Sequence, residues 1–226
     1  MNSVTLTAAD GHSLAAYVAR PSGTPRGGLV VLQEIFGVNS HIRAVADGYA
    51  ADGWVAIAPA LFDRIEVGIE LGYGAADVDR GRALKAACID EKSLLDIAAA
   101  VDHVAATGSV AVVGYCWGGT LAWLAACRMN GLRASVAYYG SGIADLAGLK
   151  PMCPVQMHFG EQDASIPPAA IDAVRKAHPE VEVHVYPAGH GFNCDQRSAY
   201  HPDSAALARE RTLRFLASPP SKRVDG

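Results

Sequence analysis

Three side chains of complementary chemistry lie far apart along this chain: Cys116, Asp163 and His190. A thiol, a carboxylate and an imidazole can form a nucleophilic relay, in which the base takes the proton of the nucleophile and the acid orients the base. Such relays occur in a few chain orders, and nucleophile, acid, base is one of them. The set therefore indicates acyl transfer through a covalent intermediate.

Cys116 stands in the sequence Gly114-Tyr115-Cys116-Trp117-Gly118-Gly119, between a β-branched run and an apolar helical segment. This has the form of a sharp strand-to-helix turn that presents a nucleophile, with cysteine in the place where serine is usual. A helix N-terminus favours negative charge and so favours thiolate over thiol. The backbone N–H of Trp117 is a candidate oxyanion donor. The alternative is a small buried cysteine in an ordinary turn, and the flanking glycines favour the catalytic interpretation.

The acid and the base each follow a predicted strand. Residues 155–160 lead to Asp163, and residues 181–186 lead to His190, which lies between two glycines. Other carboxylates near strand ends are rival acids, or plain surface charges: Asp145, Glu161 and Asp172. A metal site of His190 with His184 and His201 is a further alternative, but the spacing matches no familiar ligand pattern.

Predicted strands and helices alternate along nearly the whole chain. The expected strands are 4–7, 14–19, 29–32, 55–58, 110–114, 134–139, 155–159 and 181–186. The expected helices are 40–52, 79–106 with a break near 88–92, 117–129, 168–178 and 203–217. This order predicts an α/β fold of three layers, with a mostly parallel sheet and an antiparallel N-terminal hairpin at its edge. Function in such sheets lies at the carboxyl ends of the strands, where we expect the relay to assemble.

Composition narrows the class of protein. The 226 residues, half of them hydrophobic, are expected to form one domain, 1–226. A net charge of −4 gives no electrostatic footprint for nucleic acid. The five cysteines include no CxxC pair, and the N-terminus has no export signal, so a cytoplasmic protein with free thiols is expected. The uncharged stretch 104–127 is long enough to span a membrane, but its glycines favour strand, turn and buried helix, so no membrane contact is predicted.

Several strings together resemble the dienelactone hydrolase (carboxymethylenebutenolidase) family. They are Gln33-Glu34-Ile35-Phe36-Gly37-Val38, the Cys116 motif, Tyr138-Tyr139-Gly140 and Ala188-Gly189-His190, and the similarity continues to Glu210-Arg211-Thr212-Leu213. The resemblance implies an α/β hydrolase fold and hydrolysis of a small anionic enol-lactone through a thioester, with no metal or organic cofactor. It also implies a role in the degradation of aromatic compounds and a small-molecule ester or lactone as the partner. A monomer is expected, although no sequence feature determines the oligomeric state.

The resemblance adds site residues that spacing alone does not supply. Glu34 matches a glutamate that pairs with the resting thiol, and Ile35 matches the second oxyanion donor through its N–H. Arg82 or Arg80 matches an arginine that holds the substrate carboxylate, with Arg82 preferred. Phe36 and Tyr138, within the matching strings, are further candidates for substrate contact.

The chain departs from the family pattern in ways that bear on the substrate. A second carboxylate-binding arginine is expected four residues after the histidine, where this chain has Cys194; Arg197 follows slightly later, and Gly191 replaces a frequent serine. A broader carboxylesterase or thioesterase is therefore a second hypothesis, and a non-catalytic small-molecule receptor on the same fold is a third. For the free enzyme we expect Cys116 as a thiol turned toward Glu34, because a nearby carboxylate opposes ionisation of the sulfur.

Overall fold

A computed structural model describes residues 2–220, so that residue 1 and residues 221–226 of the predicted domain lie outside the described chain. Eight strands form one sheet in the order β1-β2-β4-β3-β5-β6-β7-β8. They are β1 (Ser3–Thr7), β2 (Ser13–Ala19), β3 (Gly28–Leu32), β4 (Val55–Pro59), β5 (Val110–Tyr115), β6 (Ser135–Tyr138), β7 (Val155–Gly160) and β8 (Glu182–Tyr186). β1 pairs with β2 and β2 with β4 in antiparallel register, and the other pairs are parallel. The predicted sheet and its antiparallel edge are confirmed.

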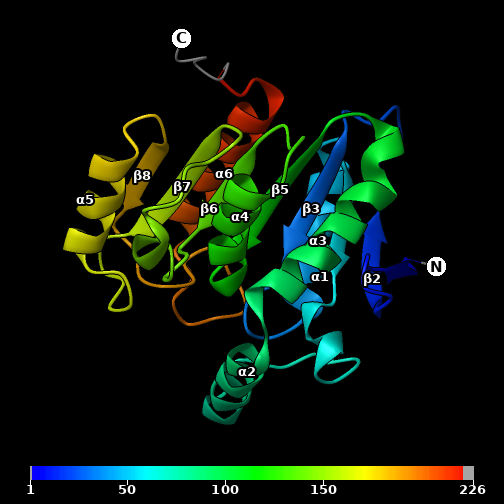
Figure 1. The fold of residues 1–226 in the computed structure, drawn as a ribbon. Helices are drawn as coiled ribbons and strands as arrows, with labels where there is room; N and C mark the ends of the chain where they lie inside the picture. Colours follow the sequence, from blue (N-terminus) through cyan, green and yellow to red (C-terminus); the bar gives the residue numbers. More distant parts are fainter. Residues whose placement is uncertain (1, 221–226) are drawn as a thin grey trace.

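Helices cover both faces of the sheet (Figure 1). On one face lie α1 (Ser40–Ala51) and α6 (Pro202–Ala217), and on the other α3 (Asp90–Val104), α4 (Trp117–Arg128) and α5 (Pro168–Ala177). Every residue of the central strands β3 and β5 is buried, because both of their faces are covered. The uncharged stretch 104–127 accordingly folds as a short 3-10 turn, β5 and α4. Within residues 2–220 no helix is both long and apolar enough to cross a bilayer.

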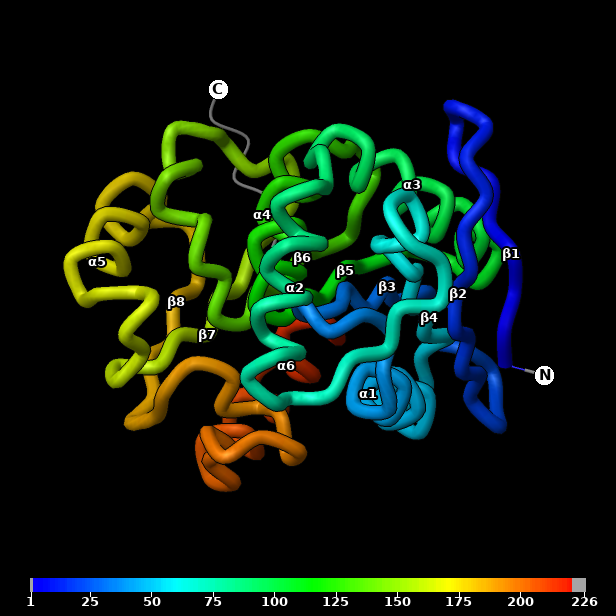
Figure 2. Tube along the Cα trace, turned by 90° about the horizontal axis from the view of Figure 1, so that it is seen from below, coloured from blue at the N-terminus to red at the C-terminus, as the bar shows by residue number. Residues whose placement is uncertain are grey.

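The predicted long helix 79–106 is two helices. α2 (Ala75–Ala87) begins earlier than predicted, and extended backbone at Cys88 and Ile89 separates it from α3, close to the expected break. α2 lies across the lower edge of the sheet, where the parallel strands end (Figure 2). Gly81 permits this approach: a Cβ there would stand 2.2 Å from the carbonyl oxygen of Ile35. The helix therefore rests directly on the segment that follows β3.

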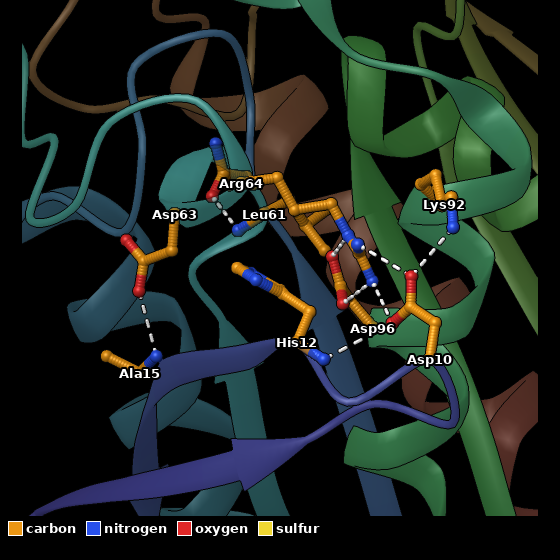
Figure 3. A network of polar contacts seen from close by, with 9 residues as sticks. Asp10, His12, Ala15, Leu61, Asp63, Arg64, Lys92 and Asp96 are labelled. Carbon is orange, nitrogen blue, oxygen red and sulfur yellow. Dashed lines mark hydrogen bonds and ion pairs between the residues drawn. The ribbon is translucent and has the colours of Figure 1, made fainter.

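A polar network fastens the N-terminal hairpin to the parallel sheet (Figure 3). Arg64, in the 3-10 helix η1 (Leu61–Arg64), donates to both carboxylate oxygens of buried Asp96 on α3, at 2.7 and 2.8 Å. The same guanidinium makes two bonds of 3.0 Å to Asp10 in the hairpin turn, and Asp63 accepts from the N–H of Ala15 on β2. Bidentate, charge-assisted bonds of this kind fix orientation as well as contact. Sequence spacing gave no indication of this network.

Candidate active site

The backbone at Cys116 is strained, as a nucleophile-presenting turn requires. Cys116 joins β5 to α4 with φ 55° and ψ −116°, a conformation that L-residues rarely adopt. A Cβ on Gly114 would lie 1.9 Å from the carbonyl oxygen of Gly118, and one on Gly118 would lie 2.4 Å from that of Leu32. The close approach of backbone atoms therefore requires glycine at these positions, which explains the glycines of the sequence motif.

Cys116, His190 and Asp163 form a hydrogen-bonded chain. His190 Nε2 lies 3.1 Å from Cys116 Sγ, and His190 Nδ1 lies 2.7 Å from Asp163 Oδ2. The side chain of Asp163 is fully buried, and its Oδ1 accepts the N–H of Ser165 at 2.8 Å. The carboxylate therefore has a fixed orientation from which it holds the imidazole.

The environment of His190 favours its protonated form. Burial opposes the charge, but the hydrogen bonds to Asp163 and Cys116 outweigh burial and raise the pKa of His190 to about 10. An imidazolium beside the sulfur stabilises a thiolate, which is the reactive form of cysteine. The rival acids lie elsewhere: Asp145 is on a 3-10 turn, Glu161 is exposed, and Asp172 pairs with Arg175 on α5.

The two predicted oxyanion donors, the backbone N–H groups of Ile35 and Trp117, lie on segments that contact each other. Ile35 follows β3 and Trp117 begins α4, so the N–H of Trp117 has no acceptor within its own helix. The two segments are joined directly, because the N–H of Gly118 donates to the carbonyl of Gln33 at 3.0 Å. Paired donors beside a nucleophile suit the charge that develops during acyl transfer.

Glu34 lies in the site, but with a different partner from the one predicted. Its side chain is 1% exposed, and its Oε1 accepts from Arg197 Nη1 at 3.2 Å. Arg197 also lies over the rings of Phe36 and Tyr73, at 5.5 and 5.9 Å from their centroids. The expected resting form, with Cys116 turned toward Glu34, is therefore wrong for this structure, in which the sulfur faces His190 and Arg197 supplies the charge partner of Glu34.

The predicted substrate-binding residues lie in different environments. Arg80 is half-exposed and pairs with Glu66, and Arg82 is exposed on α2, so a role of either in holding a substrate carboxylate stays a prediction. Phe36 is buried beneath Arg197, and Cys194 is fully buried close to Glu34.

Tyr138 lies outside the site. Its side chain is buried, its hydroxyl bonds to Thr212 on α6 at 2.7 Å, and its ring stacks on His158. The difference arises at the end of β6. Tyr138 is the last residue of the strand, whereas Tyr139 lies just beyond it with a left-handed φ of 37°, and the two rings have different histidine neighbours, His158 and His190.

Tyr139 is the aromatic residue that sequence reasoning missed. It has a φ of 37°, its ring meets that of His190 edge-on with centroids 5.1 Å apart, and its buried hydroxyl has no partner among the described residues. Burial raises the pKa of this phenol well above its usual value, and the charge of Glu34 raises it further. A tyrosine at a strand end ordinarily indicates core packing, and the matching string Tyr138-Tyr139-Gly140 did not distinguish Tyr139 from Tyr138.

The histidines of the alternative metal interpretation do not meet at one site. His190 belongs to the relay, His184 bonds to Glu182 on β8, and His201 caps the N-terminus of α6. These separate contacts leave that interpretation without support.

Comparison with known proteins extends the similarity over the whole site. The family model described as "Dienelactone hydrolase family" matches residues 14–219. The carboxymethylenebutenolidase of Pseudomonas putida is 34% identical, over 97% of this chain and 98% of its own length. A Salmonella typhimurium protein provisionally named carboxymethylenebutenolidase is 35% identical, over 95% of this chain and 86% of its own. A solved Klebsiella pneumoniae structure, provisionally named dienelactone hydrolase, is 31% identical and covers 96% of this chain and 98% of its own, with a TM-score of 0.82. The chain belongs to the dienelactone hydrolase family and has its α/β hydrolase fold.

Proposed function

We propose that this enzyme hydrolyses a small lactone or ester through a thioester formed on Cys116. The observation that carries the proposal is the continuous contact from Cys116 Sγ through His190 to buried Asp163, at 3.1 and 2.7 Å. Nucleophile, base and orienting acid are the parts that covalent acyl transfer needs.

The reaction follows from this arrangement. His190 holds the proton of the Cys116 thiol as an imidazolium, and the thiolate attacks the acyl carbon to give a tetrahedral intermediate whose oxyanion is held by the N–H groups of Ile35 and Trp117. Collapse of the intermediate breaks the bond to the leaving oxygen, which receives the proton from His190. A water molecule, deprotonated by His190, then attacks the thioester, and the acid product leaves as the thiol is restored. Asp163 keeps Nε2 of His190 directed at the sulfur throughout.

The substrate class is proposed more narrowly from the charges at the site. Arg197 is the cation beside the sulfur, but its charge is already engaged by Glu34. We therefore propose a lactone ring whose carboxylate, where one is present, contributes only weakly to binding. The same observation favours a broader carboxylesterase as the second candidate.

The test is a turnover screen with trapping of the acyl-enzyme. Wild type, Cys116→Ala and Asp163→Asn are compared on dienelactones, neutral lactones and aryl esters, and acid-quenched protein is examined by mass spectrometry. The proposal expects an acyl adduct on Cys116 and no turnover by Cys116→Ala. Undiminished turnover by Cys116→Ala refutes it, and a receptor would bind the lactone without either adduct or product.

A further inference from the structure

A second group of chemically active side chains lies next to the relay and takes no part in it. Glu34, His41 and Cys194 each offer one potential ligand atom, and these three atoms lie within 4.8 Å of one another. They come from the end of β3, from α1 and from the loop after His190. A carboxylate, an imidazole and a thiol are the three side-chain types that bind Zn²⁺.

Two atoms of this group are buried without a hydrogen-bond partner. Glu34 Oε2 and His41 Nε2 find no partner among the described residues, although the two side chains are only 1% and 4% exposed. Buried polar atoms are nearly always hydrogen-bonded, because leaving them unpaired costs free energy. A bound ion satisfies both atoms at once.

The surroundings of His41 resemble those of a metal ligand. Its Nδ1 lies 3.2 Å from Asp195 Oδ1, which leaves Nε2 as the free nitrogen. Histidines that bind a metal through one nitrogen generally engage a carboxylate through the other, which fixes the ring and raises its basicity. His41 and Asp195 also line a surface hollow of about 340 Å³ between α1 and the start of α6, so one side of the group borders a solvent-filled space.

Charge at the group balances when a dication is present. Glu34, Asp195 and a Cys194 thiolate carry three negative charges, against Arg197 and the ion. Without an ion, burial and the charge of Glu34 raise the pKa of Cys194 to about 11, so the thiol is neutral and metal binding must displace its proton. The ligand atoms of a tetrahedral zinc ion lie about 3.5 Å from one another. The side chains of Glu34, His41 and Cys194 would therefore have to move by about 1 Å to bind the ion together.

We propose that Glu34, His41 and Cys194 form a binding site for a soft divalent cation of the Zn²⁺ class, with an open fourth position, and that its occupation inhibits the enzyme. The inhibitory part rests on the proposed function: an ion on Glu34 Oε2 adds a dication to the charges around Arg197, whose own charge acts on Cys116. The binding part is independent of turnover.

Cobalt(II) is the probe for binding, because a cysteine ligand gives it a sulfur-to-metal charge-transfer band. The titration uses reduced, metal-free full-length protein carrying Cys116→Ser, which removes the catalytic thiol as an alternative ligand. We expect a near-ultraviolet band that saturates at one Co²⁺ per chain and is displaced by Zn²⁺. Adding His41→Gln should weaken binding at least tenfold, and adding Cys194→Ser should abolish the band. Adding Cys88→Ser, at a half-buried thiol outside the site, should change nothing.

X-ray absorption on the zinc-loaded Cys116→Ser protein keeps the proposal falsifiable if Cys194→Ser does not fold. One sulfur at about 2.3 Å with nitrogen and oxygen at about 2.0 Å is expected. No sulfur in the coordination shell, or a cobalt band that survives Cys194→Ser, overturns the site. In the wild type, Zn²⁺ should abolish turnover and a chelator should restore it. Full turnover of the zinc-loaded enzyme would refute the inhibitory role but not the binding site. A protein that binds the ion but cleaves no ester or lactone would refute the proposed function but not the binding site.

Discussion

Replacing Arg197 by glutamine tests how the reactivity of Cys116 is set. In the structure Arg197 neutralises Glu34, and its charge also acts on Cys116. Arg197→Gln removes a cation near the sulfur and leaves a buried carboxylate unbalanced beside it. Both changes disfavour thiolate. Alkylation of Cys116 should therefore require a higher pH in the variant.

The size of the effect follows from the charges and their exposure. Two unit charges about 6 Å apart interact by about 3 kcal/mol at an effective dielectric constant of about 20, which corresponds to about two pH units. The side chain of Arg197 is 21% exposed, so solvent screens part of this interaction. We expect the midpoint of the pH–alkylation profile to rise by about one unit, and alkylation below the midpoint to slow about tenfold.

The assay is the rate of iodoacetamide labelling of Cys116 as a function of pH, followed by peptide mass spectrometry. Glu34→Gln alone leaves Arg197 unopposed and should move the midpoint down. Glu34→Gln with Arg197→Gln should return it close to that of the wild type. Circular dichroism and thermal melting confirm that each variant is folded. Identical profiles for folded Arg197→Gln and wild type would refute this account of the site.

Three further predictions concern the relay and the fold. Asp163→Asn should lower kcat by about 10³–10⁴-fold, because His190 loses its orienting carboxylate; steady-state kinetics on the best lactone measures this, and a loss below tenfold contradicts it. The stabilisation from the raised pKa of His190 is complete below 6.5 and is lost as pH rises through about 10. Melting temperatures should therefore fall between pH 7 and 11 more in the wild type than in His190→Gln, and parallel curves would count against the pair. Arg64→Ala leaves Asp96 buried and unpaired and should cost about 3 kcal/mol of unfolding free energy; denaturant titration checks this, and Arg64→Ala with Asp96→Ala should recover part of the loss.

Local sequence determined the elements and the nucleophile. Alternating strands and helices predicted the sheet and its antiparallel edge, because each element must bury one apolar face or stripe. The glycines around Cys116 predicted the strained turn, since a Cβ added at Gly114 or Gly118 would lie about 2 Å from a backbone carbonyl oxygen, which no side chain tolerates. Asp163 and His190 were predicted because parallel strands end at one edge, so residues after those strands are brought together.

Only the tertiary structure decided which charges meet. Glu34 and Arg197 are separated by 163 positions, and no periodicity or motif relates them. No sequence pattern relates Arg64 to Asp10 and Asp96, which it binds in the structure, and none predicts the contact of Tyr139 with His190. Which side chains pair depends on the course of the loops and on distances of a few ångströms. The hydrophobic pattern of the sequence constrains only which face of a helix or strand is buried. The sequence by itself therefore determined the elements and which residues could act, and the fold decided that the sulfur of Cys116 faces a histidine while the glutamate beside it is held by an arginine.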